Sequence, residues 1–123
     1  MNDKEQIENV VQLYIDCMNE SNPSKVKKAF HENAKVVGYL HGELMQMSVD
    51  DFAGFVASQQ PPPNESDEHM VLFDTLVCEI EGTTALVKVR DRYLGITFLD
   101  TLSFLKVDGE WKIYNKLFNV EDE

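Results

Sequence analysis

Apolar residues near the start of the chain recur at helical spacing and predict a helical hairpin. The segment Asp3–Glu20 predicts an amphipathic helix, in which Asp3 and Gln6 have the spacing of a capping box. Its inward stripe consists of Ile7, Val10, Val11, Tyr14, Ile15 and Met18. Asn22 as N-cap and Pro23 in the first turn predict a second, shorter helix. The two helices are expected to pack against each other.

The next part of the chain changes to short segments typical of strands, followed by one more helix. Residues 34–40 and 43–47 predict a small β-hairpin with His41 and Gly42 in its turn. Ser48 is expected to cap a third helix, which ends before the following run of prolines.

The segment Gln59–His69 contains three consecutive prolines among acidic and polar residues. Because proline removes backbone donors, this composition predicts an extended surface loop. Two interpretations remain open, a solvated connection or a flap that gates a pocket.

Strands rich in β-branched and aromatic residues are predicted after this loop. They span about Met70 to Ile80, Thr84 to Tyr93, and Thr97 to Phe118, and the last segment is divided into two strands by Asp108 and Gly109. Asp-Gly is a strong hairpin signal, because a type I′ turn needs positive φ at both central positions.

The Asp108-Gly109 turn determines which side chains of the last hairpin share a face. The pairs expected for a two-residue loop are Val107 with Glu110, Lys106 with Trp111, Phe104 with Ile113, Leu102 with Asn115, and Asp100 with Leu117. The face predicted to meet the core carries Phe98, Asp100, Leu102, Phe104, Trp111, Ile113, Asn115 and Leu117.

A second tight turn, at Leu94 and Gly95, extends this inner face to the preceding strands. The residues then expected inside are Ala85, Val87, Val89 and Asp91, followed by Leu72, Asp74, Leu76 and Cys78. The outer face receives a basic row and several apolar side chains, namely Lys88, Arg90, Arg92, Leu99, Leu105, Tyr114 and Phe118. This is more apolar area than a monomer presents to water, and it predicts a homodimer formed through the outer sheet face.

Length and charge narrow the classes of partner. The 123 residues, 43% of them hydrophobic, fit a single domain spanning 1–123 with its own core. A net charge of -11 disfavours nucleic acid and anionic membrane surfaces. No apolar run approaches the roughly 20 residues of a spanning helix, and Met1 to Asn9 is polar, so a cytoplasmic location is expected.

Metal-ligating residue types are scattered along the chain. Cys17 and Cys78 lie far apart and are expected to be reduced core residues. His31, His41 and His69 lack the i, i+4 spacing of a helical metal site. No metal and no cofactor is therefore expected. His31 stays a candidate catalytic base, because it precedes the strand expected to border a pocket.

The order of helical hairpin, short strands, helix and long meander resembles a known superfamily. With the segments Phe30–Leu40 and Asp100–Phe118, it is similar to the nuclear-transport-factor-2-like superfamily, and most similar to its putative lumazine-binding, SnoaL-like branch. The resemblance implies an α+β, cone-shaped fold, in which a curved antiparallel sheet wraps around N-terminal helices and encloses a central pocket. It also implies a homodimer assembled through the outer sheet surface.

A candidate pocket follows from the polar residues on the inner face. Asp100 and Asn115 either satisfy each other structurally or face a cavity in which a ligand completes their hydrogen bonds. Tyr14 lies mid-stripe on the first helix, and its hydroxyl needs a polar partner. We therefore expect a cavity with Tyr14, Asp100 and Asn115 at its polar end and with Trp111 and Phe104 on its apolar wall.

The resemblance also suggests chemistry. In related ketosteroid isomerases, a tyrosine of the first helix and a late carboxylic acid form an oxyanion hole, and Tyr14 and Asp100 occupy similar places. The general base of those enzymes is missing, because this sequence has Gly38 where they carry an aspartate. Candidates to replace it are His31, Glu32 and Asp74.

Three functional hypotheses remain. The first is a non-enzymatic or weakly enzymatic protein that binds a small apolar or ring-containing molecule in the cone. The second is a lyase or isomerase with acid–base chemistry by Asp100 and Tyr14, assisted by His31. The third is a dimeric association module. The ligand, any reaction and the physiological pathway are beyond what the sequence specifies.

Overall fold

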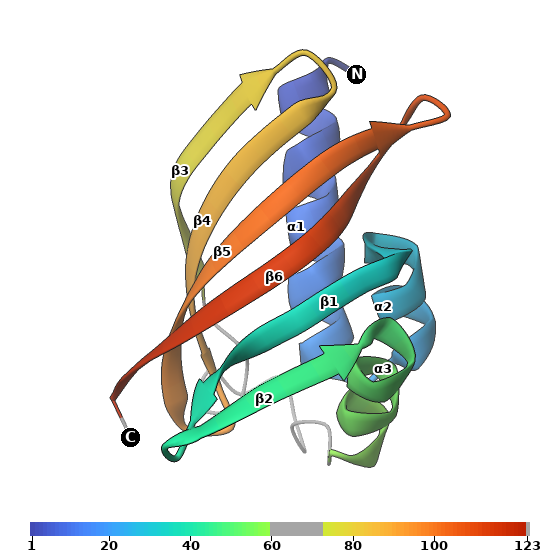
Figure 1. Ribbon diagram of the computed structural model, residues 1–123. Helices are drawn as coiled ribbons and strands as arrows, with labels where there is room; N and C mark the ends of the chain where they lie inside the picture. Colours follow the sequence, from blue (N-terminus) through green and yellow to red (C-terminus); the bar gives the residue numbers. More distant parts are fainter. Residues whose placement is uncertain (60–72, 123) are drawn as a thin grey trace.

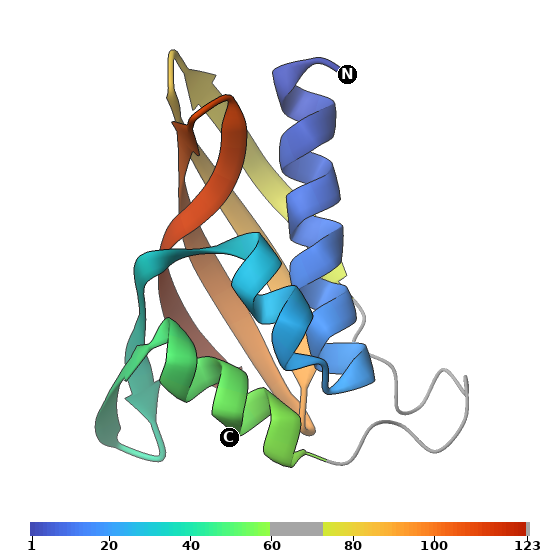
Figure 2. The same ribbon diagram turned by 90° about the vertical axis from the view of Figure 1, so that its right-hand side faces the viewer.

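The computed structural model describes residues 1–59 and 73–122 and consists of three helices and one six-stranded sheet (Figure 1). The elements in chain order are α1 (Asp3–Glu20), α2 (Pro23–Ala29), β1 (Phe30–Leu40), β2 (Glu43–Ser48), α3 (Val49–Ser58), β3 (Phe73–Glu81), β4 (Thr84–Tyr93), β5 (Ile96–Val107) and β6 (Glu110–Asp122). The three helices lie on one side of the curved sheet (Figure 2). The α+β fold with a curved sheet around the helices is confirmed.

The strand order is β2-β1-β6-β5-β4-β3. All neighbouring strands are antiparallel except β1 and β6, which are parallel, so the expectation of a wholly antiparallel sheet is wrong at this pair. The hairpin turns make the strands antiparallel within β1–β2 and within β3–β6. They do not determine whether β1 runs parallel or antiparallel to β6. Among the described residues, no helix is long and apolar enough to span a membrane.

Each of the three helices begins after an N-cap residue whose side chain accepts a backbone hydrogen bond. Asn22 accepts hydrogen bonds from the backbone at the start of α2, and Ser48 with Asp51 forms a complete capping box on α3, as expected. On α1 the N-cap is Asn2, so the predicted capping box from Asp3 is wrong. The Asp3 carboxylate instead accepts hydrogen bonds from strand residues, and Asn2 is thereby left to cap the helix.

The predicted tight turns at His41-Gly42, Leu94-Gly95 and Asp108-Gly109 are confirmed. All six residues have positive φ, as a type I′ turn requires. The predicted stripe of α1 is also confirmed, because Ile7, Val11, Tyr14, Ile15 and Met18 are buried and Val10 is partly buried.

A β-bulge changes the last hairpin halfway along its length. The expected register holds from the turn to the pair Phe104–Ile113, and then shifts so that Ser103 pairs with Asn115. Beyond the shift, Leu102 pairs with Lys116 and Asp100 with Phe118, not with Asn115 and Leu117 as predicted. One extra residue in a strand reverses the facing of every residue after it. Lys116 and Phe118 therefore turn inward, while Asn115 and Leu117 leave the inner face.

A second register shift interrupts β3 between Thr75 and Val77. Cys78 lies on the inner face and packs against the core, as expected. The inward placement of Asp74 and Leu76 is wrong, because the shift pairs Asp74 with the outward-facing Arg90 and leaves Leu76 45% exposed. The predicted inward Leu72, the start of this strand near Met70, and most of the loop Gln59–His69 lie outside the described residues.

Candidate functional site

Four polar side chains meet between α1 and the inner face of the sheet. Tyr14 comes from α1, Asp91 from β4, Asp100 from β5 and Lys116 from β6, and all four are buried. Strand alternation directs the three strand residues inward, and the bulge is what brings Lys116 to this face. The cluster therefore joins residues that are distant in sequence.

Tyr14, Asp100 and Lys116 form a continuous hydrogen-bonded chain. The Tyr14 hydroxyl donates to Asp100 Oδ2 at 2.7 Å, and Lys116 Nζ donates to the Tyr14 hydroxyl at 2.5 Å. Lys116 Nζ also lies 4.0 Å from Asp100 Oδ1. Burial, and next the charge of Asp100, hold the pKa of the Tyr14 phenol well above its usual value. Tyr14 thus stays a neutral donor.

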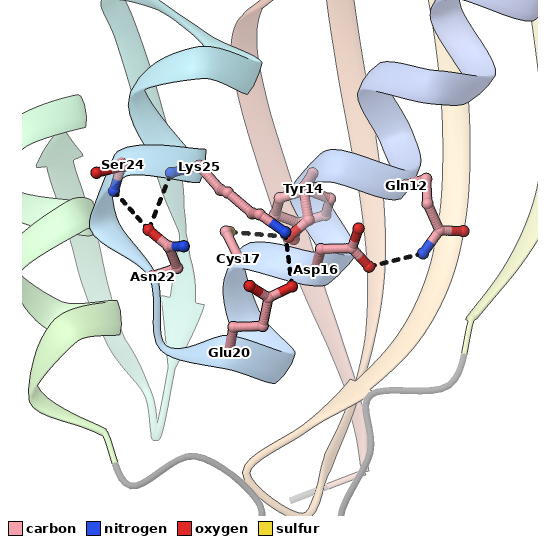
Figure 3. A network of polar contacts seen from close by, with 8 residues as sticks. All are labelled: Gln12, Tyr14, Asp16, Cys17, Glu20, Asn22, Ser24 and Lys25. Carbon is pink, nitrogen blue, oxygen red and sulfur yellow. Dashed lines mark hydrogen bonds and ion pairs between the residues drawn. The ribbon is translucent and has the colours of Figure 1, made fainter. Parts of the chain in front are cut away.

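The helix that carries Tyr14 is fixed by its own contacts (Figure 3). Cys17 donates from Sγ to the carbonyl oxygen of Tyr14, and the ion pair between Glu20 and Lys25 ties the end of α1 to α2 at 2.6 Å. Burial raises the pKa of the Cys17 thiol to about 12, so this cysteine is a neutral core residue. Cys17 and Cys78 are both free thiols.

The Lys116 ammonium group is surrounded by aromatic rings as well as by Asp100. Its Nζ lies 4.7 Å from the ring centroid of Tyr14, 4.8 Å from that of Phe52 and 5.8 Å from that of Phe118. A ring face attracts a cation, and this attraction is stronger where water is excluded. The site is therefore built to hold one positive charge on β6.

Asp91 lies beside Asp100, on the neighbouring strand of the inner face. Burial, and next the neighbouring Asp100 carboxylate, raise the pKa of the Asp91 carboxyl to about 10. At neutral pH Asp91 therefore carries a proton. That proton forms a side-chain hydrogen bond with the Asp100 carboxylate, which is part of the cause of the raised pKa. The cluster consequently combines a protonated acid with an ion pair.

A cavity of about 70 Å³ adjoins this cluster. Its polar lining residues are Asp91, Tyr93 and Lys116, and its apolar wall includes Val36, Met45, Met47, Phe52, Phe55 and Phe118. The Tyr93 hydroxyl has no hydrogen-bond partner in the described part of the chain. Leu94 lines the same cavity and is 51% exposed, so the cavity reaches the surface beside the β4–β5 turn.

The structure brings together some of the predicted site residues and separates others. Tyr14 and Asp100 are hydrogen-bonded to each other, and they lie behind the cavity wall formed by Asp91 and Lys116. Asn115 lies on the far side of β6 because of the bulge. Trp111 and Phe104 are buried in the other half of the hairpin and do not line this cavity.

The three polar residues that line the cavity, Asp91, Tyr93 and Lys116, are not among the predicted site residues. Asp91 was expected on the inner face, and a buried aspartate is itself a signal for a site. Lys116 is absent from the predicted inner face, because the sequence does not mark the bulge that turns it inward. Tyr93 directly precedes the predicted Leu94-Gly95 turn, and the side of the sheet that it faces depends on the geometry of that turn.

The candidate replacement bases do not reach the cavity. His31 stacks on Tyr114 at 4.5 Å, and its Nδ1 accepts a hydrogen bond from the backbone of Asn33. Glu32 and Asp74 are exposed. His41 lies in the β1–β2 turn, and His69 is outside the described residues.

Gly38, which the isomerase comparison singled out, faces Phe118 across the β1–β6 pair. A Cβ atom at this position would lie 2.5 Å from the Phe118 carbonyl oxygen and 2.7 Å from its ring. The Phe118 ring thus takes the space that a side chain at position 38 would need. In residues 1–59 and 73–122, no group of three or more His, Cys, Asp or Glu side chains has an arrangement suited to a metal ion.

Comparison with known proteins agrees with this architecture. A family model described as putative lumazine-binding matches residues 2–119. The chain is 28% identical over 108 residues to the aldolase FrzH of Cladobotryum sp, covering 86% of this chain and 82% of that protein. These matches involve almost the whole chain.

Two solved structures share the fold. A nuclear-transport-factor-2-like protein of unknown function from Methylobacillus flagellatus is 26% identical, with a TM-score of 0.85 and coverage of 98% of this chain and 93% of that one. A ketosteroid isomerase-like protein from Erwinia carotovora is 12% identical, with a TM-score of 0.71 and full coverage of both chains. The resemblance seen in the sequence is confirmed at the level of fold and superfamily.

Proposed function

Because the chain belongs to the putative lumazine-binding family of the nuclear-transport-factor-2-like superfamily, we propose that it binds a small, largely apolar molecule in the cavity beside Asp91 and Lys116. The ligand carries a carbonyl or similar acceptor group that enters the polar end of the cavity. The observation that carries this proposal is the buried Tyr93 hydroxyl, which has no hydrogen-bond partner among the described residues and lies on the cavity wall that also carries Asp91 and Lys116.

Burial of polar atoms without partners costs free energy unless another molecule supplies their hydrogen bonds. Tyr93 has a hydroxyl and Lys116 has an ammonium group, so both offer hydrogen-bond donors, and the protonated Asp91 carboxyl lies on the same wall. A ligand oxygen satisfies such donors, while Met45, Met47 and Phe55 supply adaptable apolar contacts for the rest of the molecule.

The size of the cavity limits how the ligand is held. About 70 Å³ accommodates the acceptor group and a few attached carbons. The remainder of a ring-containing ligand would extend past Leu94 toward the surface. Tyr14 and Asp100 act from behind the wall, where they hold Lys116 in position.

A lyase or isomerase is the second candidate, and the protonated carboxyl of Asp91 favours it. A carboxylic acid with a pKa of about 10 donates a proton to a developing oxyanion without being ionised in the resting site. The relative from Cladobotryum is named an aldolase, which is a lyase. In this version Asp91 replaces the expected pair of Asp100 and Tyr14 as the acid that meets the substrate.

Ligand screening by thermal shift, followed by calorimetry, tests the binding proposal. Lumazine and a panel of ring compounds with and without a carbonyl group are suitable probes. Tyr93→Phe removes one donor of the cavity, and a bound carbonyl compound should lose roughly 5- to 100-fold in affinity, which corresponds to one buried hydrogen bond. Tyr39→Phe is the matched control, since Tyr39 is exposed on the outer face. Equal affinities for both variants would contradict the proposal.

We also propose a homodimer through the outer sheet face, with apolar residues that differ from the predicted ones. The bulge turns Phe118 inward and leaves Leu117 49% exposed, near the paired and exposed Tyr39 and Leu44 of β1 and β2. Sedimentation at micromolar concentration should give twice the chain mass, and Leu117→Asp should give the monomer. A wild-type monomer at high concentration would exclude the dimer and the association module.

A further inference from the structure

We infer that Lys116 is a covalent site, at which its amine condenses with an aldehyde or ketone bound in the cavity and forms an iminium ion. This inference rests on the proposed function, because it uses the same cavity and the carbonyl group assigned to the ligand. Lys116 would form a covalent bond to the ligand, in addition to the hydrogen bond of the proposed function.

The position of Lys116 provides the first support. Among the residues that the structure describes, Lys116 is the buried lysine, with 6% of its surface exposed. It lines the cavity, and so do Phe52 and Phe118, two of the rings that surround its Nζ. Nζ therefore adjoins the space in which a ligand carbonyl would sit. Lysines in buried, partly apolar sites are the ones that proteins use for Schiff bases.

The electrostatics of the site provide the second support. Overall, the ammonium group and the carbonyl compound give an iminium ion and one water molecule, so the site has one positive charge before and after the reaction. Asp100 and the three aromatic rings stabilise a cation at this place, and they do so equally for the product. No oxidant, reductant or other co-reactant is needed.

The two aspartates supply the proton transfers of the first half of the reaction. Asp100, whose Oδ1 lies 4.0 Å from Nζ, takes one ammonium proton. The freed nitrogen lone pair forms the C–N bond. The π electrons of the carbonyl group then take the proton of Asp91, which lines the same cavity. The product is a carbinolamine whose nitrogen is still protonated.

The second half returns both aspartates to their starting states. The Asp91 carboxylate takes a proton from the carbinolamine nitrogen and passes it to the hydroxyl group, which leaves as water with the C–O bonding electrons. The nitrogen lone pair forms the C=N bond. The proton held by Asp100 then returns to its neighbour Asp91. The iminium carbon withdraws electrons from the adjacent bond, as a carbon–carbon lyase requires.

Reductive trapping tests this inference. The wild-type protein is incubated at neutral pH with propanal or benzaldehyde and sodium cyanoborohydride, and the modified lysines are identified by peptide mass spectrometry. We expect Lys116 to be alkylated at least about tenfold faster than the exposed Lys27, Lys28 and Lys35. Modification confined to the exposed lysines would overturn the inference.

Matched variants separate a specific reaction from general amine reactivity. Lys116→Arg keeps the charge but should abolish the rapid labelling, whereas Lys35→Arg should leave it unchanged, since Lys35 is exposed. Asp91→Asn should slow labelling of Lys116 by tenfold or more while the circular dichroism spectrum stays native. Unchanged labelling in Asp91→Asn would contradict the proton-transfer role of Asp91.

The outcome is distinguishable from failure of the proposed function. A carbonyl ligand whose affinity falls in Tyr93→Phe but which never becomes attached to Lys116 would overturn the covalent inference alone. Binding that is insensitive to Tyr93→Phe would contradict the proposed function, and rapid trapping at Lys116 would still support a reactive lysine. The two measurements thus test separate statements.

Discussion

Each half of the β5–β6 hairpin joins with one residue of α1 to bring an aspartate, a lysine and an aromatic donor into contact, but the surroundings of the two sets differ. Near the turn, Asp3 accepts hydrogen bonds from Lys106 Nζ and Trp111 Nε1, both at 3.0 Å, and the ion pair is partly exposed. Beyond the bulge, Asp100 accepts from Tyr14 and faces Lys116 with almost no exposure. The same residue types therefore serve a surface contact at one end and a buried site at the other.

The difference arises from how water screens the charges. Around Asp3, water solvates whatever the ion pair leaves unsatisfied, so the contact has little influence on the fold. Around Asp100, desolvation makes each charge depend on its partner, and Asp91 responds by keeping its proton. The buried group, which belongs to the proposed site, is consequently the more fragile of the two.

Asp100→Ala is the change expected to have the largest effect. It leaves the Lys116 ammonium group buried without its carboxylate and removes the acceptor of the Tyr14 hydroxyl. We expect a loss of about 3 to 5 kcal/mol in the free energy of unfolding, measured by chemical denaturation. Asp3→Ala is the matched control and should have a small effect, because Lys106 becomes solvated.

A double variant sharpens this test. Lys116→Met in the Asp100→Ala background removes the unpaired charge, so part of the lost stability should return. The double variant could instead have a lower free energy of unfolding than Asp100→Ala, by the full cost of a core substitution. The unpaired charge of Lys116 would then not be what destabilises the single variant. That result would show that the two ends of the hairpin differ in packing alone.

The two halves also differ in how far the sequence predicted them. Alternation and the Asp108-Gly109 turn predict the register correctly from the turn to Phe104, and the helical stripe places Tyr14 inside. Past Ser103 the prediction fails, because a bulge has no residue signature of its own here. The bulge alone explains why Lys116 faces the core, which the sequence does not predict, and why Asn115, which is predicted to face it, does not.

The sequence pattern therefore predicts that Asp100 and Tyr14 face the core, but it does not predict which residues line the cavity. Asp91 could be found as a buried acid on a strand whose neighbours Val87 and Val89 are apolar. Its protonation depends on a distance to Asp100 that only the assembled sheet sets. A sequence gives the facing of a residue within one strand, and long-range pairing decides its electrostatics.

The pH dependence of stability gives the second prediction, of intermediate size. The folded pKa of Asp91 is about 10 and the unfolded value is near 4, so between these values the folded state holds a proton that the unfolded state has lost. Stability from Asp91 is therefore present at low pH and is lost as the pH rises toward 10, by at most about 1.4 kcal/mol per pH unit. Asp91→Asn should remove this slope in denaturation curves recorded from pH 5 to 9.

Asp3 should respond in the opposite direction. The hydrogen bond from Trp111, and next that from Lys106, lower the pKa of the Asp3 carboxyl, so its contribution is present above the unfolded pKa and is lost as the pH falls. Asp3→Asn should leave the slope between pH 5 and 9 unchanged. Equal slopes in wild type and Asp91→Asn would show that Asp91 is ionised in the folded protein.

The turns at the two ends of β5 give the smallest expected effect. Asp108 has a φ of 51° and Leu94 a φ of 55°, but aspartate tolerates this left-handed region whereas leucine is strained in it. Leu94 also lines the cavity, so the strained residue lies beside the proposed ligand site. Leu94→Asn should raise the free energy of unfolding by about 0.5 to 1 kcal/mol, because relief of strain exceeds the loss of a half-exposed apolar contact. Asp108→Asn should change it by only a few tenths of a kcal/mol.

A carbonyl ligand should bind Leu94→Asn more weakly than wild type, since the apolar part of the ligand passes Leu94. If Leu94→Asn is instead destabilising, packing of the leucine side chain outweighs the backbone strain, and the two turns are equivalent in energy despite their different residues.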